Sequence, residues 1–490
     1  MSTEQRAGDE LLVEGLRLRS REAVLAHAEA LILQAWRSFD QARPGQPAVD
    51  ERVRAMLLEA LPEEPSDPRG ALDAAALVLD ESVAQSRPRF FAYVGSSGLE
   101  IGVLGDALMA SHDVNVAVAA GGAGLLERQV VGWVSDFVGF GARDGLLASG
   151  GMVSNLTALA AARERAAPGV RHLGVRDRRL TLVCSAEAHY SVHRAAEVLG
   201  IGSDNVRLVH VDAQHRIDVR ACAQLLEADR VAGALAVAVV ATAGTTLTGA
   251  VDDLASIADL CGDRGVWLHV DGAYGLPAAA APSVRDLFAG LGRADSATVD
   301  AHKWMFVPKA CSVLLMRDPL SLRAAFEHRE SYMPLVDGED AHPVDSTLEY
   351  SRPLRALKLW LAFRVHGAGA LRAAIERNLG QARLLARLLE EHPRFELCHQ
   401  PQLSTVCFRH RPSSKVNLED HHRRLVPAIQ LDGRIFLAGA LTGGSSCLRA
   451  CFVNFRTIDD DVRAIVEVVD EVGQRLAEAG SNSPAGPSAR

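Results

Sequence analysis

The sequence lacks the features that mark membrane, secreted and nucleic-acid-binding proteins. No window approaches the ~20 uninterrupted apolar residues of a membrane span. The N-terminus has no basic stretch followed by an apolar one, as a secretory signal would. The formal net charge is −9 and no basic stripe is present, which argues against phosphate-backbone binding. We therefore expect a cytoplasmic protein that binds neither a membrane nor nucleic acid.

Paired cysteine motifs are also missing. The eight cysteines are scattered, and none forms a CxxC pair. Several lie inside apolar runs, which predicts buried free thiols in a reducing compartment. The composition, 48% apolar and 23% charged, is ordinary for a soluble globular protein. A chain of 490 residues is long enough for a large core and for more than one domain.

The order of apolar patterns predicts four segments. Residues 1–85 form an N-terminal helical segment, and 86–390 form a large α/β domain in which strand-like runs alternate with helical stretches. Residues 391–478 form a smaller α+β domain, and 479–490 form a low-complexity tail. The large domain is expected to hold a mostly parallel sheet covered by helices on both faces. Such a sheet places its site at the carboxyl ends of the strands. The strand-like runs are Leu180–Cys184, Val206–Val211, Ala234–Ala241, Val266–Val270, Ala294–Val299 and Cys311–Met316.

Three polar segments follow strands or enter helices in this region. Ser149-Gly150-Gly151 precedes a helix, where backbone N–H groups and the helix dipole favour a phosphate. His189 and the threonines of Thr242–Thr246 each stand at the end of a strand. Each signal has a plain alternative, namely a turn, a surface histidine or a cap. Their convergence on one crevice favours a site.

The strongest signal is the combination of Asp271 with Lys303. Asp271 ends one strand-like run, and Lys303 follows the next in Asp300-Ala301-His302-Lys303-Trp304. A lysine among apolar groups is a Schiff-base nucleophile, although a solvated strand-end lysine is the common alternative. An aspartate after one strand and a lysine after the next is the layout of a pyridoxal-phosphate site.

At these motifs the chain resembles the group II pyridoxal-phosphate-dependent amino-acid decarboxylases, which include aromatic-L-amino-acid and glutamate decarboxylases. The resemblance runs from about Arg87 to Arg456. It is carried by the two motifs around Asp271 and Lys303, by Arg355–Trp360, and by Leu448–Ala450 with Asn454–Thr457. It implies a fold type I PLP-dependent transferase fold, with a seven-stranded sheet, a small C-terminal domain and an N-terminal segment packing on a partner subunit. It further implies a homodimeric carboxy-lyase with its active site at the subunit interface, using pyridoxal 5'-phosphate and no metal ion.

The resemblance also implies a role for each motif residue. Lys303 forms the Schiff base, Asp271 pairs with the pyridine nitrogen, and His189 stacks on the cofactor ring. Tyr332 returns a proton to the carbanion, from a loop that in this family serves the neighbouring subunit. The remaining cofactor contacts, to the phosphate, the ring and the Asp271 side, are assigned to Gly150, Gly151, Met152, Thr246, Ala273, Asp300 and His302.

The substrate is less sharply predicted. Phe91 and Tyr93 form an aromatic segment that favours an aromatic or apolar amino acid, and Arg449 is either a carboxylate ligand or a structural ion-pair residue. Met152 replaces a serine that many family members use for the phosphate. Acidic, branched-chain and diamino acid substrates stay open, as do an aminotransferase or lyase on the same fold and a cofactor-binding protein without turnover.

Overall fold

A computed structural model of the chain describes residues 18, 20–40, 49–95, 97–118, 120–328 and 343–481. A seven-stranded sheet forms its centre, in the order β1-β7-β6-β5-β4-β2-β3. Every neighbouring pair is parallel except the two pairs made by β7, so only β7 runs against the others. The predicted mostly parallel seven-stranded sheet is confirmed. The strands are β1 (Asp144–Ala148), β2 (Leu180–Ser185), β3 (Val206–Val209), β4 (Leu235–Thr242), β5 (Trp267–Asp271), β6 (Ser296–Val299) and β7 (Ser312–Met316).

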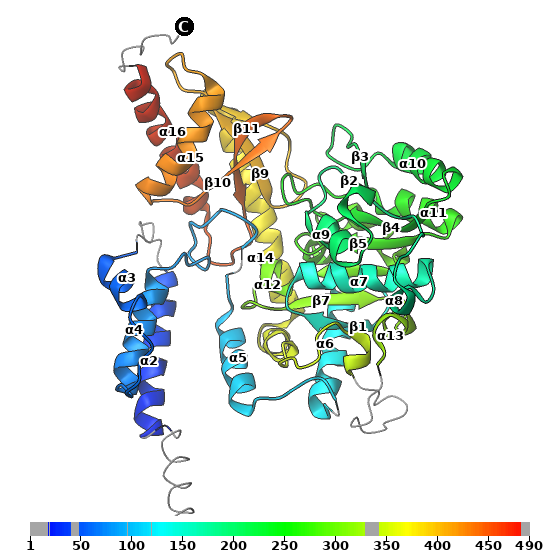
Figure 1. Cartoon of the computed structure of the whole chain (residues 1–490). Coiled ribbons are helices and arrows are strands. Elements are labelled where there is room, and N and C mark those ends of the chain that lie inside the picture. Colours follow the sequence, from blue (N-terminus) through cyan, green and yellow to red (C-terminus); the bar gives the residue numbers. More distant parts are fainter. Residues whose placement is uncertain are drawn as a thin grey trace, which may run out of the picture.

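Helices cover both faces of this sheet (Figure 1). Consecutive strand residues alternate between two hydrophobic clusters: Val183 and Val239 belong to one, and Leu182 and Val240 to the other. Burial of both faces explains why the inner strands are almost continuously apolar. The first cluster is closed by α6 (Gly122–Val138), α10 (Val219–Val231) and α11 (Leu254–Arg264), and the second by α7 (Gly151–Ala166), α9 (Ser191–Val198) and α13 (Leu320–Phe326). Short helical turns complete this part: α8 (Val170–Leu173), η1 (Ser203–Asn205), η2 (Leu276–Ala280), η3 (Arg285–Phe288), η4 (Leu291–Arg293), α12 (Ala301–Trp304) and η6 (Pro343–Ser346).

A second, antiparallel sheet of four strands has the order β10-β11-β9-β8. It packs with α15 and α16 around a separate hydrophobic cluster. The long helix α14 (Ala356–Glu391) connects the two sheets and is interrupted at Gly367, where φ is 73° and ψ is 158°. The elements are β8 (Phe395–Leu397), β9 (Thr405–His410), α15 (Leu418–Asp432), β10 (Ala438–Thr442), β11 (Ser445–Cys451) and α16 (Asp459–Ser481).

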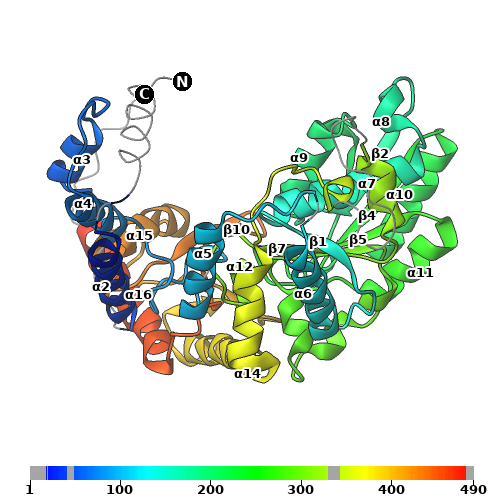
Figure 2. The ribbon, with the colours of Figure 1, turned by 90° about the horizontal axis from the view of Figure 1, so that it is seen from below.

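The N-terminal helices lie on the side of the small sheet, away from the seven-stranded one (Figure 2). They are α2 (Arg21–Phe39), α3 (Glu51–Leu57) and α4 (Pro68–Asp80), followed by α5 (Glu100–His112). Two of their leucines are largely exposed, Leu25 at 71% and Leu79 at 70%. Docking of this segment on a second subunit, and the four segment boundaries, stay predictions. No helix in the described ranges is long and apolar enough to cross a bilayer, and all eight cysteines are free.

Candidate active site

Lys303 lies at the carboxyl edge of the large sheet, on the short helix α12 that follows β6. Its Nζ is 2.8 Å from Oδ2 of Asp300, which stands directly before this helix. Asp300 is 2% exposed, and its other oxygen, Oδ1, is buried without a hydrogen-bond partner. The next residue, Trp304, is fully buried, stacks on Tyr274 and thereby fixes the helix. The lysine is therefore held by an ion pair that has one unused acceptor.

Asp271 ends the neighbouring strand β5, in register with Thr298 of β6. Its Oδ1 accepts a hydrogen bond from the Ala273 N–H at 3.2 Å, and its Oδ2 accepts one from Nδ2 of Asn155 at 2.9 Å. Because parallel neighbouring strands end at the same edge, Asp271 and Lys303 face one site, as predicted from their spacing.

His189 follows β2 and completes this group. Burial lowers the pKa of its imidazole, while the charges of Asp271 and Asp300 raise it and that of Lys303 lowers it further. The ring therefore lies within electrostatic reach of all three groups. Its Nδ1 accepts the Ser191 N–H at 3.2 Å, which leaves Nε2 to carry the proton of the neutral ring. A flat, half-buried, neutral imidazole is suited to stacking on an aromatic ligand.

The start of α7 forms a narrow cradle beside these residues. A Cβ on Gly151 would come within 2.9 Å of Asp300 Oδ2 and 3.0 Å of the Ala273 Cβ. Gly150 provides no side-chain cap, and its carbonyl accepts the N–H groups of Val153 and Ser154, so the N–H groups of Gly151 and Met152 are the ones available to an anion. His302 lies beside them, with its Nε2 3.8 Å from Asp300 Oδ2 and its pKa lowered mainly by burial. Backbone donors at a glycine cradle fit a phosphate group, and a lysine, a carboxylate and an imidazole beside it fit an aromatic aldehyde with a ring nitrogen.

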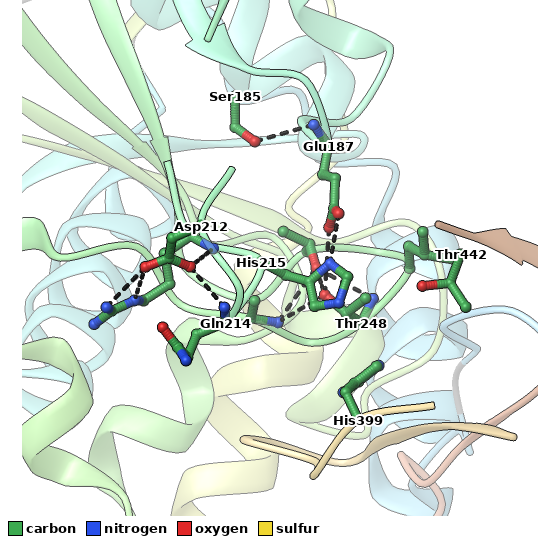
Figure 3. A network of polar contacts seen from close by, with 12 residues as sticks. Ser185, Glu187, Asp212, Gln214, His215, Thr248, His399 and Thr442 are labelled. Atoms are coloured by element: carbon green, nitrogen blue, oxygen red, sulfur yellow. Dashed lines mark hydrogen bonds and ion pairs between the residues drawn. The ribbon is translucent and has the colours of Figure 1, made fainter. Parts of the chain in front are cut away.

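A polar network ties together the loops after β2, β3 and β4 (Figure 3). Glu187, two residues before His189, lies 2.6 Å from Nδ1 of His215, and Thr248 Oγ1 donates to it at 3.5 Å. Thr246 itself is exposed, and its carbonyl accepts a hydrogen bond from Nη1 of Arg449 at 2.6 Å. Arg449 thus joins the small sheet to the Thr246 turn, which is the contact expected of a structural residue.

The aromatic residues predicted to contact the substrate differ in how far they are buried. Phe91 is 1% exposed and packs on Phe452 within the small-sheet core. Tyr93, by contrast, is 56% exposed, and its backbone has a φ of 58°. Phe90, the residue before Phe91, stacks its ring on Phe436, and the centroid of that ring lies 6.2 Å from that of Tyr93. Tyr332 lies outside the described residues. Substrate binding by Phe91, Tyr93 and Arg449 stays a prediction, as does proton donation by Tyr332.

Sequence reasoning missed Asn155. This residue lies on α7, four positions after Gly151, and is 1% exposed. Asn155 stands between two other polar residues of this helix, Ser154 and Thr157, which are also buried, so the sequence offered no signal that would single it out.

The conserved domain of pyridoxal-dependent decarboxylases matches residues 51–411. The aromatic-L-amino-acid decarboxylase of Bacillus atrophaeus is 32% identical over 449 residues, covering 89% of this chain and 92% of that protein. The human cysteine sulfinic acid decarboxylase is 32% identical over 396 residues, covering 76% and 78%. The crystal structure of mouse CSAD has a TM-score of 0.86 at 25% identity and covers 93% of this chain and 99% of its own. The structure of Oryza sativa TDC with PLP and tryptamine shares the fold, with a TM-score of 0.87 at 23% identity over 94% of this chain and 99% of its own. The chain therefore belongs to the pyridoxal-dependent decarboxylases: it is a carboxy-lyase that uses pyridoxal 5'-phosphate to decarboxylate an amino acid.

Proposed function

We propose that this enzyme converts an L-amino acid with an aromatic or apolar side chain to the corresponding amine and carbon dioxide, with Lys303 as the cofactor-binding lysine. The observation that carries the proposal is the grouping of Lys303, Asp271 and His189 beside the glycine cradle at the start of α7. Pyridoxal phosphate supplies the electron sink that accepts the electron pair left on Cα when carbon dioxide departs.

The protein's own groups have distinct tasks in this proposal. Lys303, which is paired with Asp300 at 2.8 Å, is the residue that would hold the cofactor aldehyde, and the Asp300 carboxylate would lie beside the cradle. Asp271 would accept a hydrogen bond from the protonated ring nitrogen of the cofactor, and His189 and Ala273 would pack against opposite faces of the ring. The N–H groups of Gly151 and Met152, with Gly150 and His302 beside them, would hold the phosphate. Thr246 supports the Asp271 side.

Tyr332 is the proposed proton donor to Cα. Since its loop serves the neighbouring subunit in the family that the sequence resembles, a homodimer with shared active sites belongs to the proposal. A cytoplasmic location belongs to it as well.

The preference for an aromatic or apolar side chain rests on the surroundings of Tyr93. Beside it, the rings of Phe90 and Phe436 stack on each other, with 5.1 Å between their centroids. Two cations near this segment are engaged, since Arg89 pairs with Asp461 at 2.8 Å and Arg456 lies 3.5 Å from Glu100. An apolar side chain would bury against these rings without leaving a charge unpaired.

A second candidate is an acidic amino acid, and Lys309 favours it. The pKa of Lys309 is lowered by partial burial and then by the charge of Lys303, so this ammonium lies near the site. It donates to Gln85 Oε1 at 2.7 Å and has further donors for a carboxylate or sulfinate. Branched-chain and diamino acids stay open as further substrates, and neither observation favours them.

A panel of amino acids tests the choice. The purified, cofactor-loaded enzyme is incubated with phenylalanine, tyrosine, tryptophan, valine, glutamate, cysteine sulfinate and 2,4-diaminobutyrate, and carbon dioxide and keto acids are measured separately. We expect carbon dioxide, with the highest kcat/KM for an aromatic or apolar substrate and little effect of Lys309→Met. Preference for glutamate or cysteine sulfinate, lost in Lys309→Met, would establish the acidic candidate. Keto acid without carbon dioxide would refute decarboxylation.

A further inference from the structure

A buried chain of side-chain hydrogen bonds extends from Asp271 into the core of the protein. Asp271 Oδ2 accepts from Asn155 Nδ2 at 2.9 Å, and Asn155 Oδ1 lies 3.0 Å from His269 Nε2. His269 Nδ1 lies 2.8 Å from Ser296 Oγ, which accepts from Trp267 Nε1 at 2.8 Å. These five residues come from α7, β5 and β6, and each is at most 6% exposed.

The chemistry of its members fixes the direction of every hydrogen in this chain. The indole N–H of Trp267 can only donate, so Ser296 accepts from it and turns its own hydrogen to His269. The amide oxygen Oδ1 of Asn155 can only accept, so His269 carries its proton on Nε2 and accepts from Ser296 at Nδ1. Complete burial lowers the pKa of His269 to about 4, which keeps the ring neutral with that single proton. Each donor in the chain therefore points toward Asp271.

This arrangement polarises Asp271 without passing a proton to it. The positive ends of four successive dipoles face the carboxylate, and water screens them little because none of the five residues is more than 6% exposed. The Asn155 amide has no proton to give up at ordinary pH, so it separates Asp271 from the titratable ring of His269. Asn155 also donates to Ser191 Oγ at 3.0 Å, which fixes its amide plane and its orientation.

We infer that Asn155 and His269 are positioning residues that hold the Asp271 carboxylate aimed at the pyridine nitrogen of the cofactor. The inference deepens the proposed function and rests on it, because it presupposes that Asp271 pairs with that nitrogen. Asn155 acts on Asp271 directly, and His269 acts through Asn155, with Ser296 and Trp267 selecting its tautomer. This series of hydrogen bonds therefore strengthens a single contact of the cofactor, the one between Asp271 and the ring nitrogen.

That restriction defines the test. Dissociation constants are measured for pyridoxal phosphate and for its 1-deaza analogue, in which carbon replaces the ring nitrogen, on the cofactor-stripped full-length protein. We expect the wild type to prefer pyridoxal phosphate. Asn155→Leu should weaken binding of pyridoxal phosphate by about ten- to a hundredfold and leave the 1-deaza analogue within about threefold, because a hydrogen bond to a charged group contributes on this scale.

Asn378→Leu is the matched control. Like Asn155, Asn378 is a buried asparagine held by side-chain hydrogen bonds. Its Oδ1 accepts from the Trp304 indole at 3.0 Å, and its Nδ2 donates to Gln381 Oε1 and to the Asn454 carbonyl, not to Asp271. It should change the affinity for both cofactors by the same factor. If Asn155→Leu behaves in this way too, while the wild type discriminates, the inference is overturned and the role of Asp271 stands. If the wild type binds both cofactors equally, the role of Asp271 fails, and the inference fails with it.

Variants of His269 keep the test decisive if Asn155→Leu does not fold. Glutamine retains an N–H that can reach Asn155 Oδ1, whereas leucine removes it. We expect His269→Gln to retain most of the preference for pyridoxal phosphate and His269→Leu to lose several-fold of it. Equal preference in the two variants would contradict a role for the histidine proton.

Discussion

Substituting Gly151 by alanine should damage both the apoprotein and its affinity for pyridoxal phosphate. The added Cβ would lie 2.9 Å from Asp300 Oδ2 and 3.0 Å from the Ala273 Cβ, against an ordinary contact limit of 3.4 Å. Asp300 must therefore retreat by about half an ångström, and it is 2% exposed and paired with Lys303 at 2.8 Å. Overpacking of this kind costs about 1–3 kcal/mol. The same displacement narrows the cradle, so we expect cofactor affinity to fall by about five- to a hundredfold.

Gly150→Ala is the matched comparison. Gly150 has extended backbone angles, φ −179° and ψ 168°, and its added Cβ would meet only His302 Cε1, at 3.8 Å. The urea midpoint of the apoprotein is measured for both variants, and the free energy of unfolding follows from it. We expect a loss of about 1–3 kcal/mol for Gly151→Ala and less than about 0.5 kcal/mol for Gly150→Ala. Equal losses, or none for Gly151→Ala, would refute the close approach of Gly151 to Asp300.

Three further predictions concern pH, the Tyr332 loop and Arg449. Because burial lowers the pKa of His269 from 6.5 to about 4, the unfolded chain binds a proton more tightly than the folded one. This residue's contribution to stability is therefore complete above pH 6.5 and is lost as the pH falls toward 4. The difference in unfolding free energy between wild type and His269→Gln should narrow by about 2 kcal/mol between about pH 7.5 and 5, and a constant difference would contradict the lowered pKa. Tyr332→Phe should slow amine formation and, in oxygen, divert product to aldehyde; unchanged amine turnover would remove this tyrosine from the mechanism. Arg449→Met should lower thermal stability more than it raises KM, since the guanidinium is buried and donates to the Thr246 carbonyl; a raised KM at unchanged stability would instead make Arg449 a carboxylate ligand.

The sequence pattern was sufficient to predict the central sheet, for a physical reason. Strands such as β4 and β5 are buried on both faces and read as short apolar runs between turn residues. The strands β1, β8 and β10 were not predicted. Each has at most five residues, and β1 begins with an exposed aspartate and with Gly145 at a φ of 148°. Short edge strands of this kind carry too little periodicity to be recognised.

From the sequence, only the site residues that directly follow a strand could be predicted. Asp271, His189 and Lys303 each follow a strand, and parallel topology brings such positions together. The ion pair of Lys303 with Asp300 depends on the helical turn that α12 makes immediately after β6. The hydrogen bond between Asn155 and His269 joins residues 114 positions apart, on a helix and a strand. No local pattern encodes such a contact. The burial of Phe91 likewise depends on Phe452, in the small sheet's core.

The most direct test of the account is to locate the lysine that binds the cofactor. The chain has four lysines, Lys303, Lys309, Lys358 and Lys415. The cofactor-loaded enzyme is reduced with borohydride, digested, and searched by mass spectrometry for the phosphopyridoxyl group. We predict the modification on Lys303, and loss of both visible absorbance and carbon dioxide release in Lys303→Ala. Modification of Lys309 with Lys303 unmodified, or an active Lys303→Ala enzyme, would contradict the central claim.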